Sequence, residues 1–168
     1  AMTSGDVSTL TINLDNNDTS AATLSADLVD NLPAGVTVAS PANNGGSCPG
    51  TVNSPVVGGT ITYTNGSTLP AGGCAITVDV TSSTVGTVTN TIAADALITN
   101  LGNNAASASD DLTLSAVVAP TVYKSFSPDS IGLNGISTLT ITLGNTNTYA
   151  ATLSTALVDT LPTACNGD

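Results

Sequence analysis

One lysine stands out among the few residues of this chain that could carry chemistry. Lys124 is the only basic residue, and all 12 acidic residues are Asp. A lysine amine can be joined to an Asn side chain by an isopeptide bond when an apolar pocket keeps the amine neutral and a buried carboxylate moves protons. Lys124 alternates with Val122 and Phe126, so we expect these three side chains to share the inward face of a strand.

The partners for such a bond come from an Asn and an Asp that each occur twice in similar surroundings. The candidate electrophile is Asn145 or its earlier counterpart Asn16, and the candidate acid is Asp159 or its counterpart Asp30. The alternative is that Lys124 lies along the surface or forms an ordinary ion pair.

Three cysteines define the redox chemistry open to the chain. Cys48, Cys74 and Cys165 form no C-x-x-C pair, and the chain contains no His, which excludes a zinc site or a Cys-His catalytic pair among these residues. Cys48 and Cys74 enclose a Gly-rich segment and are predicted to form a disulfide, with two buried free thiols as the alternative. Cys165 is left to pair with a residue elsewhere.

An Asx-rich turn is a weak candidate for a calcium site. Asp15, Asn17 and Asp18 supply the oxygen ligands that Ca²⁺ prefers. Their spacing matches no EF-hand loop, and the related segment 144–147, which reads GNTN, contains no carboxylate. A plain Asx turn is therefore the favoured interpretation, and no cofactor is expected.

Composition excludes several classes of function. The net charge of −11 arises from scattered Asp residues, whereas nucleic acids and anionic membranes require Lys and Arg. No apolar run approaches the roughly 20 residues of a membrane span. Without His, Arg or Glu, and without a recognisable nucleophile-base pair, the chain is not expected to be an enzyme.

The chain is rich in Thr, Val and Ile and nearly free of polar helix formers, which favours strands. Alternating runs separated by turn residues predict about seven strands, and the Asn/Ala/Ser-rich segment 96–111 is predicted to be a loop. The predicted strands span residues 7–14, 22–30, 35–39, 59–64, 74–81, 85–94 and 111–118. This pattern predicts an all-β, immunoglobulin-like β-sandwich of antiparallel sheets.

An internal repeat sets the domain organisation. The segment Val7–Pro33, VSTLTINLDNNDTSAATLSADLVDNLP, recurs without a gap as Ile136–Pro162, ISTLTITLGNTNTYAATLSTALVDTLP, with 18 of 27 positions identical. The offset of 129 residues is the size of a sandwich domain. We therefore expect residues 1–118 to form one repeat that lacks its leading strand. Residues 119–168 would supply the leading strands of the next repeat, including one over Thr121–Phe126, and could complete a neighbouring domain or chain.

Four motifs resemble those of a known family. They are VYKSFSP at residues 122–128, STLTITLGN at 137–145, DNLPAGV at 30–36 and LPAGGC at 69–74. The chain is similar to the tandem immunoglobulin-like repeat domains of unknown function in large bacterial and archaeal cell-surface proteins. That resemblance implies a sandwich fold and an extracellular, cell-surface location. The segment Pro162–Cys165 departs from the LPAGV continuation of the family.

These features lead us to expect a structural repeat of an extracellular stalk, sheath or filament. Its partners would be other copies of itself or adjacent repeats, joined head to tail by strand complementation. The alternative is an adhesive or ligand-binding module for carbohydrate or ice. Thr-x-Thr pairs such as Thr9/Thr11 suggest ice binding, but they lie on separate predicted strands, and aromatic residues for sugar binding are scarce.

Overall fold

The computed structural model describes residues 2–3, 5–147 and 149–162. The chain divides into two compact units, Ala1–Ala116 (unit 1) and Val117–Asp168 (unit 2), and each is described by itself. The described residues form strands, turns and loops but no helix. Consequently, no helix in this part of the chain is long and apolar enough to cross a membrane.

Unit 1 contains fourteen strands among its described residues, several of them only two residues long. They are β1 (Met2–Thr3), β2 (Val7–Leu14), β3 (Ala22–Thr23), β4 (Leu28–Asn31), β5 (Val36–Val38), β6 (Gly45–Gly46), β7 (Val52–Asn53), β8 (Thr60–Tyr63), β9 (Thr68–Leu69), β10 (Cys74–Ser82), β11 (Gly86–Ile92), β12 (Ile98–Thr99), β13 (Gly102–Asn103) and β14 (Ala108–Ser115).

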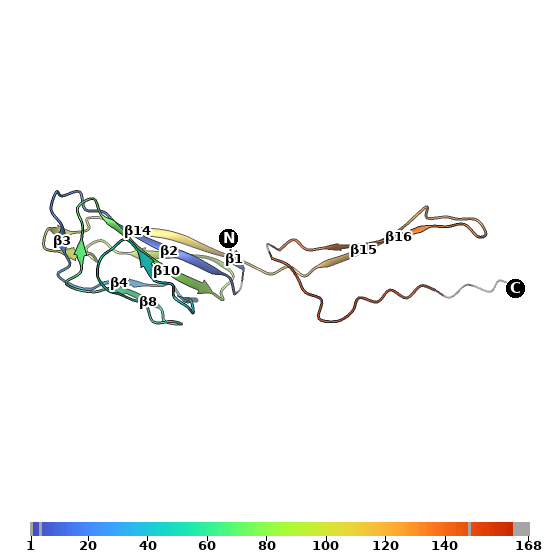
Figure 1. Ribbon diagram of the computed structural model, residues 1–168, viewed down its shortest axis with the longest axis horizontal. Helices are drawn as coiled ribbons and strands as arrows, with labels where there is room; N and C mark the ends of the chain where they lie inside the picture. The colour runs from blue at the N-terminus through green and yellow to red at the C-terminus, as the bar shows by residue number, and fades with distance from the viewer. Residues whose placement is uncertain (1, 4, 148, 163–168) are drawn as a thin grey trace. The chain divides into compact units, whose positions relative to one another are not determined.

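The first layer of unit 1 is built on the long antiparallel pair of β2 and β10, which run side by side in Figure 1. Their register places Ile12 opposite Ile76. The strand order is β2-β10-β5, with β6 also pairing with β10. β2 is therefore an edge strand of this sheet.

The second layer contains two antiparallel groups, β14-β11 and β4-β8-β7. A side-chain hydrogen bond between Asn90 of β11 and Asp30 of β4 links the groups. β1 adds to β14 as a short parallel pair at Leu114–Ser115, the exception to the antiparallel pairing. Except for that pair, the predicted all-β sandwich of antiparallel sheets is confirmed.

The core of unit 1 lies between the two layers because the strands alternate inward apolar and outward polar residues. Along β2, Ile12 and Leu14 are buried while Thr11 and Asn13 are exposed, as the alternation predicted. The main buried cluster comprises Ile12, Leu14, Ala22, Leu24, Leu28, Val38, Ile61, Tyr63, Leu69, Ile76 and Val78. The hydroxyl of Tyr63, the largest fully buried side chain, lies within hydrogen-bond distance of the backbone carbonyls of Pro49 and Thr68 and can donate its one proton to either of them.

Several predicted elements differ from the structure. Unit 1 has fourteen strands among its described residues rather than about seven, and the predicted strand 111–118 is found as β14, Ala108–Ser115. The predicted strand 22–30 is divided into β3 and β4 by a break at residues 24–27. The predicted loop 96–111 contains β12, β13 and the first residues of β14. Its polar side chains direct this pairing: Asn104 accepts from the backbone N–H of Leu97 and donates to the carbonyl of Ala93. A local polar composition was misread as irregular structure.

Unit 2 is a two-stranded antiparallel ribbon of β15 (Thr121–Ser127) and β16 (Thr138–Gly144). β15 forms over the predicted leading strand and extends it by one residue. The register places Lys124 opposite Ile141 and Phe126 opposite Leu139. Most of the apolar side chains of the ribbon are exposed, including Val122 and Leu143.

Candidate functional site

A groove of about 580 Å³ on unit 1 lies between the edges of β2 and β14. One wall is β2 from Ser8 to Asn13, and the other is β14 from Ala108 to Leu112. Between them the groove is lined by Asp30, Leu32, Pro33, Val36, Val80, Asn90 and Ile92. We call this feature the β2–β14 groove.

Both walls of the groove are strand edges with backbone groups available for pairing. β2 is terminal in its sheet, and in the described part of the chain β14 pairs with β1 only at Leu114 and Ser115. Unpaired N–H and C=O groups on such edges are templates for an added strand. Leu10 and Leu112, on opposite walls, are only half-buried, so the groove is also incompletely packed.

Asp30 and Asn90 form a buried polar pair in this groove. Asp30 is 1% exposed, and its Oδ2 accepts a hydrogen bond of 2.7 Å from Nδ2 of Asn90. The other oxygens, Oδ1 of Asp30 and Oδ1 of Asn90, are buried and have no hydrogen-bond partner among the described residues. Burial raises the pKa of Asp30 above its usual value of 3.8, and the hydrogen bond from Asn90 offsets only part of that rise.

Unpartnered buried oxygens are costly, so the pair is a candidate site for a hydrogen-bond donor or a cation. Sequence reasoning considered Asp30 but missed Asn90. The available signal was its position on β11, where Asn90 alternates with Val88 and Ile92 and shares their half-buried face. An Asn between two apolar residues on an inward face indicates a specific polar contact.

In unit 2, the structure brings together two of the three residues predicted for an isopeptide bond. Nζ of Lys124 lies 2.7 Å from Oδ1 of Asp159, and it also lies 5.9 Å from the ring centre of Phe126. Asp159 occupies the repeat position of Asp30. The first and second copies of the repeat thus place their equivalent carboxylates in different polar pairs, with Asn90 in unit 1 and with Lys124 in unit 2.

The third predicted residue has other partners. Asn145 donates through Nδ2 to the carbonyl of Tyr149, and its Oδ1 accepts from Asn147. Its counterpart Asn16 donates to the carbonyls of Ser20 and Leu69. In both copies this Asn holds a turn together, which makes Asn90 the stronger candidate for an electrophile beside a carboxylate.

The predicted disulfide between Cys48 and Cys74 is confirmed, with a Cα–Cα distance of 4.8 Å. It joins the start of β10 to the loop that follows β6, and both half-cystines pack against the core. Disulfides are typical of proteins in oxidising compartments, including the extracellular space. Cys165 lies outside the described residues.

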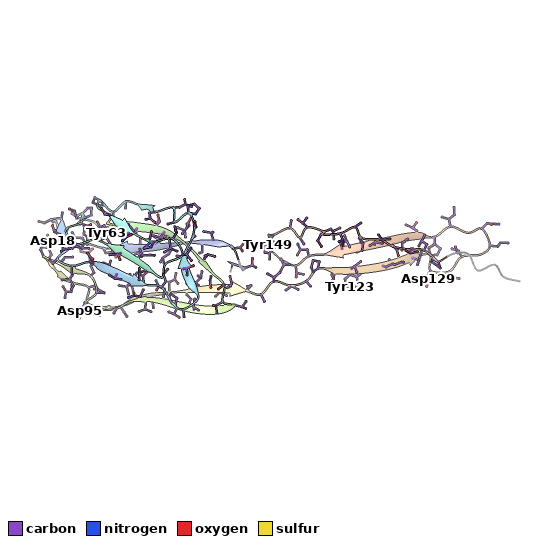
Figure 2. The ribbon with its side chains drawn as sticks, turned by 90° about the horizontal axis from the view of Figure 1, so that it is seen from below. Asp18, Tyr63, Asp95, Tyr123, Asp129 and Tyr149 are labelled. Carbon is purple, nitrogen blue, oxygen red and sulfur yellow. A yellow bond between two sulfur atoms is a disulfide. The ribbon has the colours of Figure 1, made fainter. Side chains whose placement is uncertain are left out.

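The weak calcium candidates form an Asx turn. The backbone N–H of Asp18 donates to Oδ1 of Asn16, and the N–H of Ser20 donates to Oδ1 of Asp18. Figure 2 shows Asp18 at one end of unit 1. Within the described ranges, no group of three or more His, Cys, Asp or Glu residues is placed to hold a metal ion.

Comparison with known proteins identifies the family of this chain. No curated protein and no solved structure matches the chain. A protein family matches residues 1–114 and 120–166, which together cover most of both units. The chain belongs to this family, described as a domain of unknown function (DUF7933).

Proposed function

We propose that this protein is a structural repeat of an extracellular stalk, sheath or filament, in which copies join head to tail by strand complementation. Strand β15 of one copy would occupy the β2–β14 groove of the next. The observation that carries this proposal is the groove itself, with its free strand edges and the half-buried Leu10 and Leu112 on its two walls.

The pairing of β15 with β16 supplies the template for this assembly. β16 repeats β2 at an offset of 129 residues, so the antiparallel register of unit 2 can be transferred to the free edge of β2. Lys124 lies opposite Ile141, the counterpart of Ile12. Residues directly opposite each other in an antiparallel pair share a face, so Lys124 would enter the groove on the buried side of β2.

The same register places two apolar side chains of β15 in the groove. Val122 would lie opposite Leu14, and Phe126 would lie opposite Leu10. In unit 2 these donor side chains are 58% and 47% exposed, respectively. Burying each of them would stabilise the complex by about 1.5–3 kcal/mol before the entropy of association is subtracted.

Such an assembly is open-ended and can continue to grow. The donor strand and the acceptor groove are different surfaces of the chain, so every added copy presents a new strand or a new groove. A head-to-tail contact that does not close into a ring produces a filament. The disulfide, together with a surface whose net charge of −11 derives from Asp alone, supports an extracellular setting.

Light scattering after size-exclusion chromatography, over a range of protein concentrations, tests the proposal. We expect multimers that grow with concentration and appear as filaments by electron microscopy. A synthetic peptide of residues 120–129, PTVYKSFSPD, should cap the groove and shorten them.

A matched pair of variants tests the register. Phe126→Asp places a charge on the inward face of the donor strand and should leave the protein monomeric, whereas Ser125→Asp, on the outward face, should still assemble. A protein that stays monomeric at every concentration would contradict strand complementation.

A further inference from the structure

We propose that the β2–β14 groove is also a cross-linking site, where Lys124 of a second copy forms an isopeptide bond with Asn90 and Asp30 transfers the protons. This inference rests on the strand complementation proposed above. It assigns a covalent role to a buried polar pair that the packing of unit 1 leaves incompletely hydrogen-bonded.

The sequence repeat indicates how the three side chains would meet in the groove. In unit 2, the amine of Lys124 reaches Oδ1 of Asp159 at 2.7 Å from its position opposite Ile141. Ile12 and Asp30 are the counterparts of Ile141 and Asp159, so a lysine opposite Ile12 in the groove is directed at Asp30. Asn90 is already 2.7 Å from Asp30, and its Cγ therefore lies beside the incoming amine.

The surroundings of the pair favour a reactive lysine. A lysine attacks only as the neutral amine, and burial among apolar side chains favours that form. Leu10, Leu32 and Ile92 line the groove together with Asp30 and Asn90, while Asp110 and Asp111 lie on its β14 wall. The raised pKa of Asp30 favours a protonated carboxyl group, which can donate a hydrogen bond to the carbonyl oxygen of Asn90 and polarise it.

No other Lys or Arg side chain of the chain competes with Lys124 for Asp30, because Lys124 is its only basic side chain. The free Oδ1 of Asp30 is thus available to the lysine of an incoming strand.

The reaction exchanges one amide for another and needs no oxidant, reductant or energy source. On docking, a proton passes from the ammonium of Lys124 to the carboxylate of Asp30, and the neutral amine attacks Cγ of Asn90. Asp30 then carries a proton from the attacking nitrogen to the departing one. The Cγ–Nδ2 bond breaks, ammonia leaves, and a secondary amide joins Nζ of Lys124 to Cγ of Asn90.

The decisive experiment is denaturing analysis of the assembled full-length chain. Multimers formed at neutral pH are reduced, boiled in detergent and analysed by gel electrophoresis and intact mass spectrometry. We expect a ladder that survives reduction, with each link lowering the mass by about 17 Da, one ammonia. Proteolysis should release one branched peptide that contains both Lys124 and Asn90.

Single-residue variants test the role of each of the three residues in the cross-link. Lys124→Arg retains the charge without the nucleophilic amine and should abolish the ladder, as should Asn90→Ala. Asp30→Asn should slow the appearance of links at least tenfold while multimers still form. Asn103→Ala, at an exposed Asn of β13, is the matched control and should cross-link like the parent chain.

Mixing the two inactive variants guards against simple misfolding. The Lys124→Arg chain retains an intact acceptor, and the Asn90→Ala chain retains an intact donor. Each alone should yield no covalent product, whereas the mixture should yield a covalent dimer and no larger species.

The outcomes separate this inference from the function on which it rests. Multimers that dissociate fully in detergent, with the mass of the unmodified chain, would overturn the isopeptide bond and leave strand complementation standing. A protein that never assembles would overturn both. A monomer lighter by one ammonia, without a ladder, would place the bond within one chain and overturn the link between copies.

Discussion

β2 in unit 1 and β16 in unit 2 have nearly the same sequence and very different surroundings. Both form strands, yet Leu14 of β2 is 6% exposed and its counterpart Leu143 of β16 is 56% exposed. In unit 1, the buried face of β2 is covered by a second layer of strands, whereas the two-stranded ribbon of unit 2 has no such layer among its described residues (Figure 1). Alternation therefore specifies a strand and its apolar face, while burial requires the rest of a sandwich.

The equivalent acidic residues of the two units also differ in burial and in hydrogen-bond partner. Asp30 is almost fully buried beside Asn90, while the side chain of Asp159 is 27% exposed and pairs with Lys124. One repeat position therefore holds a desolvated carboxyl group in unit 1 and an exposed ion pair in unit 2. Each unit therefore carries part of the set of three residues proposed for the cross-link: Asp30 and Asn90 lie in unit 1, and Lys124 lies in unit 2.

Truncating the matched leucines should produce the largest difference between the units. Leu14→Ala removes buried methyl groups from the core and should lower the free energy of unfolding of unit 1 by about 2–5 kcal/mol. Leu143→Ala removes an exposed side chain and should change the measured free energy of unfolding by less than about 0.5 kcal/mol. Urea denaturation of both variants, at concentrations where the parent chain is monomeric, measures the difference. Equal losses would mean that β16 is buried in solution.

Breaking the disulfide should have the next largest effect, and only in unit 1. The Cys48–Cys74 bridge spans 26 positions, and closing a loop of that size stabilises a fold by about 3 kcal/mol. The double variant Cys48→Ser/Cys74→Ser should lower the midpoint of thermal unfolding accordingly, as followed by circular dichroism. Reduction of the parent chain is the control and should reproduce the loss; an unchanged midpoint would contradict a structural role for the bridge.

The strands could be predicted from sequence far better than the site. Strand β2 matches its predicted bounds, 7–14, because Leu10, Ile12 and Leu14 alternate with polar residues and an Asx turn follows. The pairing of β12 with β13 was missed because polar hydrogen bonds, rather than apolar alternation, hold that segment.

Prediction of the site depended on contacts between residues that are far apart in the sequence. Lys124 and Asp159 are 35 positions apart, and Asp30 and Asn90 are 60 apart. The repeat alone related Asp159 to Asp30, so one of the three residues, the carboxylate, could be predicted from it. No repeat marked Asn90, because the sequence contains no second copy of β11; its alternation with Val88 and Ile92 was the one signal. Only the packing of β11 against β4 brings Asn90 to the carboxylate.

The buried carboxyl group of Asp30 should make the stability of unit 1 depend on pH. Its folded pKa is raised above 3.8 by burial, so the folded state binds more protons than the unfolded state. Stability should therefore fall as the pH rises from 3.8 through the folded pKa, and then remain level. Asp30→Asn should flatten this part of the profile and raise stability at neutral pH. Asp159→Asn is the matched control; a parent profile that rises with pH over this range would contradict the assignment.

The smallest expected effect concerns a hydrogen bond that β2 makes and β16 does not. Oγ1 of Thr9 donates to Oδ1 of Asp79 at 2.7 Å, and hydrogen bonds from Asn43 and Thr9, in that order of size, hold the pKa of Asp79 below 3.8. A lowered folded pKa stabilises the fold above pH 3.8, and that contribution is lost as the pH falls through the folded value. Thr9→Ala should therefore weaken unit 1 slightly at neutral pH and shift the carboxyl resonance of Asp79 toward an ordinary titration in NMR.

Thr138→Ala removes the counterpart of Thr9 on β16 and should leave both the titration of Asp79 and the stability of unit 1 unchanged. An unaltered Asp79 titration in Thr9→Ala would show that Asn43 alone lowers the pKa.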